Sequence, residues 1–357
     1  MKQVLDVDGL DYKITISDDS FLKLVEEIDS FTSGKKRLFV VSKNVYKLYK
    51  TELNLSNSEV LILNDGEKEK SLKNYVKILE KAVQLGLTRN DVLIAIGGGV
   101  IGDITGFAAS SYMRGIDYIQ IPTTLLSMVD SSVGGKTAID MCGAKNIVGA
   151  FYQPKAVFIN INFLKTLEKR QLLSGIGEIL KYAFIENNCG YKHSLFMFEY
   201  LTLCCEKLLE CEPITLMRVI EYCLRLKISV VSQDEKEKDL RKVLNFGHTL
   251  AHAIEAKTKF QKFTHGEAVV YGMFFILDWA YSKNYITYSY YRLSHELLSK
   301  YGFKPLNLKN FSELELLEFM KKDKKALQDK ISFIIPTDKK VVKEIKLSFD
   351  EVLEMFK

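Results

Sequence analysis

The sequence predicts a doubly wound α/β domain over residues 1–160 and a helical domain over residues 161–357. Three observations support this division. From about Lys36, short β-branched runs alternate with helical stretches, which is the pattern of an α/β fold with a mainly parallel sheet. A glycine-rich segment stands directly between one such run and a helical stretch. After Asn160, strand-like runs nearly vanish and long amphipathic stretches take over, although no linker composition marks the boundary.

Five apolar runs predict the strands of the sheet. Each is too short and too continuously apolar for a surface helix, so we expect strands that are buried on both faces. Between the second and third runs, apolar residues recur at helical spacing from Leu72 to Val83, and Gly86 stands where this helix would end. The five runs are LFVV (38–41), VLIL (60–63), VLIAI (92–96), YIQI (118–121) and AVFINI (156–161).

The third run leads directly into the glycine-rich segment. Gly97, Gly99 and Gly102 fit the spacing G-x-G-x-x-G between a strand and a helix, as a dinucleotide-binding turn requires. Glycine lets the backbone approach a pyrophosphate, and the first turn of the helix offers free amide groups to it. A plain tight turn remains the alternative, because the next strand ends in Pro-Thr-Thr (122–124) and not in an acidic residue that would hold a ribose.

Two loops that follow strands are further candidates for anion binding. Residues 64–71 (NDGEKEKS) open a helix, and a solvated charged turn is their ordinary interpretation. Residues 127–149 carry Asp130, Lys136, Lys145 and Asn146 amid glycines and other small residues, with little helical or strand periodicity. Glycines beside lysines bring backbone amides and ammonium groups to one anion. A segment of this length without secondary structure inside a compact domain is usually functional.

In the helical domain, two kinds of segment carry charge. Residues 170–185 predict an amphipathic helix with Glu178 and Lys181 three residues apart, and a surface ion pair is the simple explanation. Their neighbours are apolar or glycine, however, so the carboxylate needs a partner, and a metal ion is one. Residues 233–242 (QDEKEKDLRK) and 321–330 (KKDKKALQDK) have the composition of solvated surface loops.

Three of the five histidines fall within residues 244–268, at positions His248, His252 and His265. Neutral imidazole is the most common side-chain ligand for divalent metals, so this crowding suggests a metal or phosphate site. His248 and His252 are four residues apart and would share a helix face, which makes them the natural ligand pair by spacing alone. The alternative is that each histidine caps or packs a helix separately.

The overall composition excludes several classes of protein. A formal charge of +5 on 357 residues fits an anionic small molecule better than a nucleic-acid surface, since Lys and Arg are interspersed with Asp and Glu throughout. The N-terminus lacks an apolar signal segment, and the longest apolar run, near 268–277, is about half of what spans a bilayer. The six cysteines form no CxxC pair and are typical of free thiols in a reducing compartment. We therefore expect a cytoplasmic protein without a nucleic-acid or membrane partner.

Nine motifs together resemble the 3-dehydroquinate synthase family of the sugar-phosphate cyclases. They occur in the family's order, and the resemblance as a whole runs from about residue 40 to 336. The resemblance implies an NAD-dependent lyase of the shikimate pathway with a zinc-type metal, usually a homodimer, with a Rossmann-like N-terminal domain and an all-α C-terminal domain. The motifs are DGExxKS (65–71), GGGVxGD (97–103), YxRG (112–115), PTTLL (122–126), VDSSVGGKT (129–137), KNxxGAFxQP (145–154), GExxKY (177–182), LNFGHTxxHAIE (244–255) and HGEAV (265–269).

Carried over residue by residue, the resemblance makes Glu178, His248 and His265 the ligands of a divalent metal, zinc or cobalt. It overrules the spacing argument, because His252 becomes a residue on the substrate side. A glutamate with two histidines leaves coordination positions open, as a catalytic zinc site requires.

The resemblance also implies two sets of contacts. It moves the charged segment 233–242 from surface loop to site, and it makes either Lys324 or Lys325 a further phosphate contact. The implied NAD contacts are Asp65, Glu67, Lys70, Gly98, Gly99, Asp103, Thr123, Thr124, Lys136, Lys145, Phe163 and Thr166. The implied catalytic and substrate contacts are Arg114, Asp130, Lys136, Lys145, Asn146, Lys181, Lys227, Glu237, Arg241, Asn245 and His252.

The implied reaction converts 3-deoxy-D-arabino-heptulosonate 7-phosphate, a phosphorylated sugar acid, to 3-dehydroquinate and phosphate. It combines transient oxidation by NAD, phosphate elimination, re-reduction and an intramolecular aldol closure. Three alternatives are a sister sugar-phosphate cyclase, a metal-dependent polyol dehydrogenase, and a catalytically inactive NAD-binding protein. A dehydrogenase would not need so many phosphate-binding cations, and intact Lys181, Asn245 and His252 argue against an inactive protein.

Overall fold

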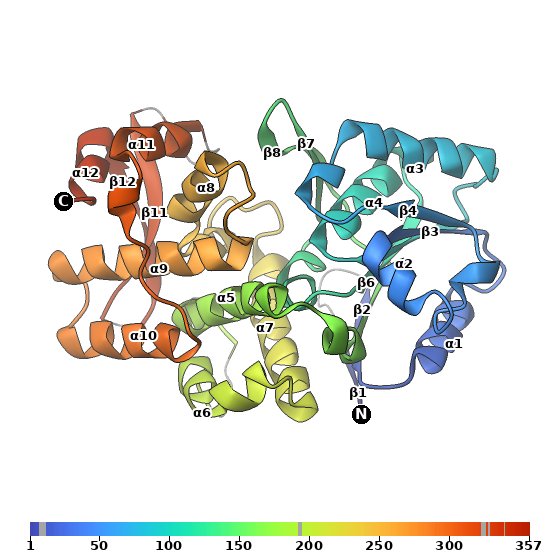
Figure 1. Cartoon of the computed structure of the whole chain (residues 1–357), viewed down its shortest axis with the longest axis horizontal. Coiled ribbons are helices and arrows are strands. Elements are labelled where there is room, and N and C mark those ends of the chain that lie inside the picture. The colour runs from blue at the N-terminus through green and yellow to red at the C-terminus, as the bar shows by residue number, and fades with distance from the viewer. Residues whose placement is uncertain (7–11, 192–194, 323–325, 328, 339) are drawn as a thin grey trace. The chain divides into compact units, whose positions relative to one another are not determined.

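The computed structural model describes all residues except 7–11, 192–194, 323–325, 328 and 339 (Figure 1). The chain divides into two compact units, one with residues 1–168 and 216–224 and one with residues 169–215 and 225–357. Asn160, the expected last residue of the first domain, thus lies inside the first unit, which continues to Glu168. The middle of helix α7 (Pro213–Gln233) belongs to the first unit and its two ends belong to the second.

A seven-stranded sheet forms the centre of the first unit. Its strand order is β1-β2-β9-β6-β5-β3-β4, and every neighbouring pair is parallel except β1 with β2. All five predicted strands are present, and the hairpin of β1 and β2 is an addition that the sequence did not predict. The strands are β1 (Lys2–Asp6), β2 (Lys13–Ser17), β3 (Arg37–Ser42), β4 (Val60–Leu63), β5 (Val92–Gly97), β6 (Asp117–Pro122) and β9 (Ala156–Asn160).

The expectation that all five strands are buried on both faces is wrong for β4. Strands β5 and β9 are buried along their whole length, whereas Ile62 of β4 is 43% exposed. The reason is its position at the edge of the sheet, where one side of the strand has no neighbour.

Helices follow the strands of this unit and bury apolar stripes against the sheet. Helix α3 begins after Ser71, whose side chain accepts a hydrogen bond from the Asn74 amide, and it ends just before Gly86, which has a φ of +61°. Ile78 of α3 and Ile104 and Ala108 of α4 lie in one apolar core with Leu38 and Ala95 of the sheet. The helices are α1 (Phe21–Phe31), α2 (Lys43–Tyr49), α3 (Leu72–Gln84) and α4 (Gly99–Ser111).

The expectation that residues 127–149 lack secondary structure is wrong. They form the π-helical turn η4 (Ser127–Ser131) and most of an antiparallel hairpin of β7 (Lys136–Met141) and β8 (Ala144–Phe151). Small residues hide the strand periodicity, but they permit close packing. A Cβ atom on Gly106 of α4 would lie 2.5 Å from Cγ2 of Thr137, so α4 accepts the hairpin only because it carries glycine there.

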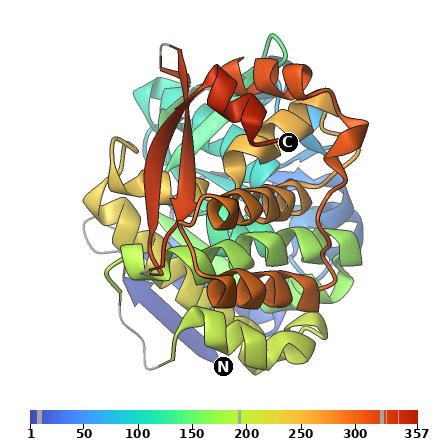
Figure 2. The same ribbon diagram turned by 90° about the vertical axis from the view of Figure 1, so that its left-hand side faces the viewer.

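The second unit is mainly helical, as predicted, and it also contains a small antiparallel sheet of order β10-β11-β12, of which Figure 2 shows β11 and β12 as a long ribbon. Its helices are α5 (Lys169–Ile185), α6 (Met197–Leu209), α8 (His248–Lys257), α9 (His265–Ser282), α10 (Tyr288–Lys300), α11 (Glu313–Lys322) and α12 (Phe349–Glu354), with the ends of α7. Its strands are β10 (Ala326–Leu327), β11 (Lys330–Pro336) and β12 (Val342–Ser348).

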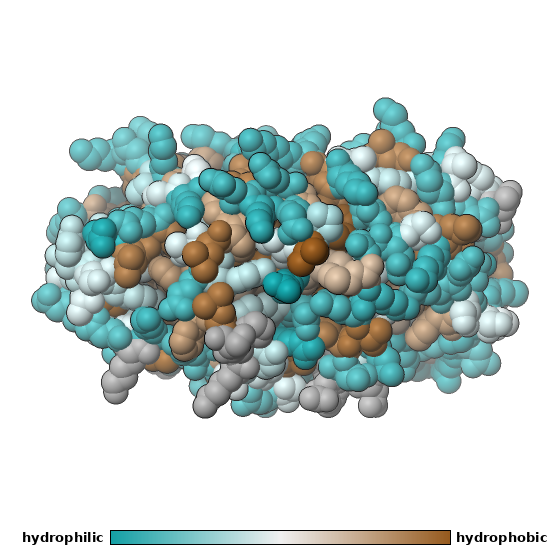
Figure 3. All heavy atoms as spheres, turned by 90° about the horizontal axis from the view of Figure 1, so that it is seen from below, coloured by the Kyte–Doolittle hydropathy of each residue, from teal (hydrophilic) through white to brown (hydrophobic). Residues whose placement is uncertain are grey.

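The face of the protein in Figure 3 is mostly polar. Figure 3 shows one face on which hydrophilic side chains predominate and hydrophobic ones lie in small separate groups. Scattered apolar side chains of this kind are normal on a protein surface. Among the described residues, no helix combines the length and the apolar character needed to cross a membrane.

Candidate functional site

In the first unit, the residues expected to contact NAD follow four parallel strands. Because β4, β5, β6 and β9 belong to one parallel array, their carboxyl ends lie at the same edge of the sheet, where α/β folds bind ligands. Helix α4 starts at Gly99 at this edge. The residue at its N-cap is Gly98, which has no side chain to bind the first amides of the helix, so these amides can bind an anion. Asp65, Glu67 and Lys70 follow β4; Gly98, Gly99 and Asp103 follow β5; Thr123 and Thr124 follow β6; Phe163 and Thr166 follow β9.

The glycine turn is pressed against the neighbouring loop. The Thr123 amide donates to the Gly97 carbonyl over 3.0 Å. A Cβ atom on Gly98 would lie 3.1 Å from Cγ2 of Thr124, and one on Gly99 would lie 2.9 Å from Oγ of Ser131. A side chain at Gly98 or Gly99 would therefore force Thr124 or Ser131 to shift, before any ligand is considered.

Lys70 holds two of the expected contact residues together. Its side chain is 4% exposed, and its ammonium group lies 2.5 Å from Oδ2 of Asp103 and donates to Oδ1 of Asn146. Burial by itself would lower the pKa of Lys70, but Asp103 and Glu67 offset it and raise the pKa above its ordinary value. Lys70 is therefore a buried permanent cation at the binding edge.

The tip of the β7–β8 hairpin is fastened to the turn after β4 by further polar contacts. Lys145 lies 3.7 Å from Glu67, and the backbone amide of Asn146, which has a φ of +52°, donates to Asp140 over 2.9 Å. The Asp140 amide donates in turn to the Lys70 carbonyl. The sequence analysis did not single out Asp140. It lies in the segment 127–149, between two of the motifs, and is the acidic residue nearest to Lys145 and Asn146 along the chain.

Two of the expected NAD contacts have their side chains engaged elsewhere. The ring of Phe163 is buried against the rings of Phe21 and Tyr49. The hydroxyl of Thr166 lies 2.6 Å from the hydroxyl of Tyr49. The buried ring of Phe163 leaves only its backbone for a cofactor contact, whereas Thr166 is exposed.

The remaining expected residues of this unit lie at two different places. Asp130 is in η4 and Lys136 begins β7, both in the segment that follows the carboxyl end of β6. Arg114 ends the 3-10 turn η3 (Tyr112–Arg114), after the last residue of α4 and before β6 begins. The 13 residues of α4 are about 20 Å long, so Arg114 and the glycine turn lie at opposite edges of the sheet. This unit does not bring Arg114 to its own glycine turn.

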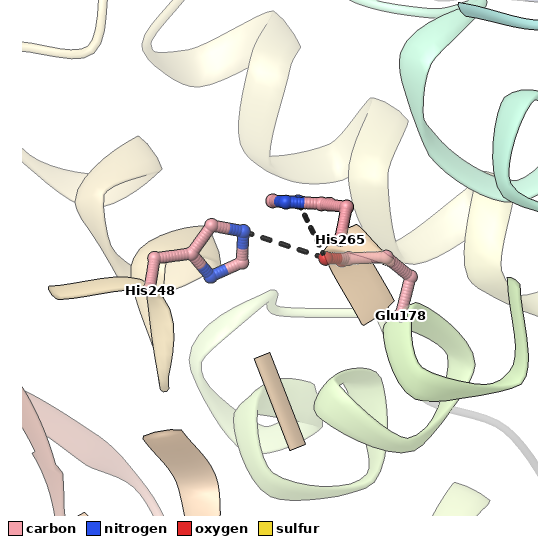
Figure 4. Close-up of side chains that lie close together, drawn as sticks. All are labelled: Glu178, His248 and His265. Carbon is pink, nitrogen blue, oxygen red and sulfur yellow. Dashed lines mark ion pairs between the residues drawn. The ribbon is translucent and has the colours of Figure 1, made fainter. Parts of the chain in front are cut away.

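In the second unit, three helices bring Glu178, His248 and His265 together (Figure 4). Oε1 of Glu178 lies 3.4 Å from Nε2 of His248 and 3.2 Å from Nε2 of His265. Oε2 of Glu178 lies 2.5 Å from the ammonium group of Lys181, one turn further along α5. Glu178 and Lys181 are both fully buried, so the simple explanation of a surface ion pair is wrong.

Glycines beside these residues let the helices cross closely enough to form the cluster. A Cβ atom on Gly177 of α5 would lie 2.4 Å from the carbonyl oxygen of Gly266 in α9, and one on Gly266 would lie 1.8 Å from the Ser174 carbonyl. Gly247 precedes α8 with a φ of +79°, and its carbonyl oxygen lies 1.9 Å from the place of a Cβ on Gly272. Each of the three clustered residues thus adjoins a glycine at a helix contact.

Each histidine of the cluster has its Nδ1 atom held by a second group. Nδ1 of His248 lies 3.0 Å from the Phe246 carbonyl, and Nδ1 of His265 lies 3.1 Å from Oε2 of Glu255. A carbonyl accepts only from an N–H, so the Nε2 atom of His248 keeps its lone pair and faces Glu178. Burial lowers the pKa of His248 to about 4, so the ring is neutral at neutral pH.

The donor set fits a divalent metal ion. Burial by itself would raise the pKa of Glu178, but the adjacent ammonium group of Lys181 lowers it well below its ordinary value, so the carboxylate is charged. Within the described residues, neither oxygen of Glu178 makes a well-directed hydrogen bond, although both are buried. A zinc-type ion binds to a charged carboxylate oxygen and to the lone pair of a neutral imidazole nitrogen, and this site offers both. His265 differs, because Glu255 and Glu178 raise its pKa despite burial, and metal binding there must displace a proton.

His252 lies beside this cluster without being part of the trio. Its ring is 5.5 Å from that of His248 and 6.1 Å from that of His265, measured between centroids. A second group of possible ligand atoms consists of His252, Glu255 and His265. The sequence analysis gave Glu255 no role at the site. Its spacing could have suggested one, because it stands seven residues after His248 and three after His252 and so shares their helix face.

Asp234, the first acidic residue of the charged segment 233–242, holds the backbone of this segment in place. The carboxylate of Asp234 accepts from the backbone amides of Lys238 over 2.8 Å, Asp239 over 2.7 Å and Arg241 over 3.0 Å. Burial would raise the pKa of Asp234, but these three amides lower it, so the anion is stabilised. Arg241 is buried, which a solvated loop does not explain.

Two further expected residues of this region bind each other. The amide of Asn245 donates to Oε1 of Glu237 over 2.6 Å, just before α8 begins. Lys227 of α7 is buried in the second unit. Lys324 and Lys325 lie outside the described residues.

The chain matches the models of 3-dehydroquinate synthase N-terminal over residues 60–174 and 3-dehydroquinate synthase C-terminal over residues 175–326. It is 46% identical over 321 residues to a 3-dehydroquinate synthase of Alkaliphilus metalliredigens (strain QYMF), covering 89% of this chain and 88% of that relative. A second 3-dehydroquinate synthase, from Thermoanaerobacter sp. (strain X514), is 39% identical over 99% of both chains. The fold is also similar, with a TM-score of 0.83, 24% identity and 99% of both chains covered, to that of 2-deoxy-scyllo-inosose synthase complexed with carbaglucose-6-phosphate, NAD+ and Co2+.

Proposed function

Because the chain belongs to the 3-dehydroquinate synthase family, we propose that it converts 3-deoxy-D-arabino-heptulosonate 7-phosphate to 3-dehydroquinate and phosphate. The observation that carries the proposal is the convergence of Glu178, His248 and His265 with the buried cation Lys181 in one unit. Membership gives the reaction, and this cluster supplies the groups that the reaction needs.

In this proposal, the trio holds a divalent metal, zinc or cobalt, and the carboxyl edge of the sheet holds NAD. When bound, NAD supplies reversible hydride transfer and the metal supplies Lewis acidity toward a substrate oxygen. The amides at the start of α4 and the positive charge of Lys70, which is bound to Asp103 and Asn146, would favour the negative charge of the dinucleotide at this edge. Backbone and side chain thus share the binding of the cofactor.

The remaining residues act on the substrate. Oxidation of one hydroxyl of the sugar acidifies the neighbouring C–H, the phosphate then leaves by elimination, the hydroxyl is restored, and the ring closes by an intramolecular aldol step. The hydride that is removed is returned, so the net redox change is zero. The phosphate dianion gains charge as it leaves, and fixed ammonium and guanidinium groups stabilise that charge. We assign this role to Lys136, Lys145, Lys181, Lys227 and Arg241, and the binding of the substrate's polar groups to Asp130, Asn146, Glu237, Asn245 and His252.

We also propose that the protein is a cytoplasmic homodimer and that Arg114 acts on the site of the second copy. The support is its position at the opposite edge of its own sheet from the glycine turn. Mixing two inactive variants, Arg114→Ala and Glu178→Gln, tests the idea. In a symmetric dimer, the hybrids regain one intact site in two, so about a quarter of wild-type activity returns if Arg114 acts across the interface. No recovery in dimers shown to have exchanged subunits refutes this role.

The reaction itself is tested by phosphate release from the heptulosonate phosphate. We expect release that needs both NAD and a divalent metal, that stops with a chelator, and that leaves no NADH absorbance behind. Phosphate release with glucose 6-phosphate but not with the heptulosonate phosphate would indicate a sister cyclase. Accumulation of NADH with a polyol, without phosphate release, would indicate a dehydrogenase.

A further inference from the structure

Glu255 lies on the same face of α8 as His248 and His252 but has no place in the proposed reaction. It stands seven residues after His248 and three after His252, and its side chain is 3% exposed. A buried carboxylate that far from water needs a strong partner. One partner is the imidazole of His265, with Oε2 of Glu255 3.1 Å from Nδ1.

The two nitrogens of His265 face two different carboxylates. Nδ1 faces Glu255 on α8, and Nε2 faces Glu178 on α5 at 3.2 Å. His265 is the first residue of α9, so its backbone is fixed by the start of that helix. The capping box there consists of Thr264 and Glu267, and Glu267 also binds Arg170. The helix start and the ring orientation are thus set by different acids.

We propose that Glu255 is a positioning residue for the metal site: it accepts a hydrogen bond from Nδ1–H of His265 and thereby directs the Nε2 lone pair toward the metal. This inference rests on the proposed metal site of Glu178, His248 and His265. A histidine ligand whose other nitrogen donates to a carboxylate has a fixed tautomer, a fixed ring plane and a more basic ligand atom. The Phe246 carbonyl does the same for His248, so each imidazole has its own outer partner.

The geometry favours this role over a second metal site at His252, Glu255 and His265. A metal bound there through Nδ1 of His265 would compete with the Glu255 contact, and it would need the imidazole to lose both protons if the first site were filled as well. A hydrogen bond needs only the neutral ring. Metal stoichiometry separates the two, with one ion per chain for a positioning role and two for a second site.

The test is the zinc affinity of full-length variants, measured by competition with a chromophoric chelator. Replacement of an outer carboxylate weakens metal binding by 10–100-fold in other sites. We expect Glu255→Ala to weaken zinc binding by about that factor and Glu255→Gln to weaken it less, because the Gln carbonyl still accepts a hydrogen bond but carries no charge. Glu267→Gln is the matched control, since Glu267 holds the same helix start without touching the imidazole and Gln preserves the capping box. It should bind zinc like the wild type.

Wild-type zinc affinity for Glu255→Ala, or an equal loss for Glu267→Gln, overturns the positioning role. If wild-type protein itself binds no zinc, the proposed metal site fails, which is a different result. Nitrogen-15 NMR of the histidine rings in zinc-loaded wild-type protein needs no variant at all. We expect His265 to carry its proton on Nδ1 and the metal on Nε2; metal on Nδ1 refutes the inference even if a Glu255 variant does not fold.

Discussion

The two candidate binding regions, the glycine turn of the first unit and the cluster of Glu178, His248 and His265 in the second, bind through different chemical groups. The glycine turn of the first unit offers backbone amides, and its requirement is space: a Cβ atom on Gly98 or Gly99 would come within about 3 Å of a neighbouring side chain. The cluster of the second unit offers side chains, and its requirement is charge balance: Glu178, Lys181 and His248 are buried together. The first region should therefore be sensitive to added atoms, and the second to lost charges.

The largest effect is expected from Glu178→Gln. This change removes the one carboxylate that both histidines and Lys181 approach, so metal binding should be lost and phosphate release should fall by more than the roughly 100-fold seen for outer-partner changes. Breaking a buried ion pair should also lower the unfolding free energy of the metal-free protein by about 3 kcal/mol. Metal content, phosphate release and urea unfolding measure these effects. An active, zinc-loaded Glu178→Gln variant would contradict the difference between the two regions, because the negative charge of Glu178 would then not matter in the buried cluster.

A smaller and opposite pattern is expected from Gly99→Ala. The added Cβ would lie 2.9 Å from Oγ of Ser131, so NAD binding should weaken by about tenfold while zinc affinity stays unchanged. Titration calorimetry with each ligand measures both. The double variant Gly99→Ala with Ser131→Ala removes the clashing oxygen and should recover part of the affinity. Loss of zinc binding in Gly99→Ala would show that the two regions are not separable.

Asp140→Asn should weaken the binding edge moderately. Asp140 accepts from the Asn146 amide, and loss of its charge should loosen the hairpin tip and weaken NAD binding by roughly fivefold, which corresponds to about 1 kcal/mol, the net contribution of one ordinary hydrogen bond. Asp117→Asn is the matched control, because Asp117 begins β6 at the opposite edge and pairs with Lys35. If Asp117→Asn weakens NAD binding as much, the hairpin tip has no special role.

The smallest effect concerns thiol reactivity. Cys142 at the hairpin tip is exposed, whereas burial raises the pKa of Cys189 to about 12 and of Cys204 to about 11. At pH 8, the two buried thiols are ionised to about one part in a thousand or less, so iodoacetamide should modify Cys142 first, as mass spectrometry will show. Because folding raises these pKa values, the associated stability is present below about pH 9 and is lost as the pH rises toward 12. Equal labelling of Cys142 and Cys189 would contradict the burial of Cys189.

Several features could be predicted from the sequence because they depend on neighbours along the chain. The five strands and the helix from Leu72 follow from local apolar patterns, and the glycine turn follows from a strand that runs directly into glycines. The β7–β8 hairpin escaped prediction because its small residues carry no periodicity, and the exposure of β4 escaped because strand order is not a local property.

The sequence by itself determined the alternating strands and helices, the glycine turn and, through nine ordered motifs, the family. Spacing alone pairs His248 with His252, and the resemblance to the family replaced that pair with Glu178, His248 and His265. Only the tertiary structure showed how these side chains meet, because α5, α8 and α9 cross at glycines and place Glu178 and His265 at His248. It also places Arg114 away from the glycine turn and gives His265 the carboxylate of Glu255. The physical reason is that helix contacts between distant segments depend on where backbones come close, and no local pattern records that.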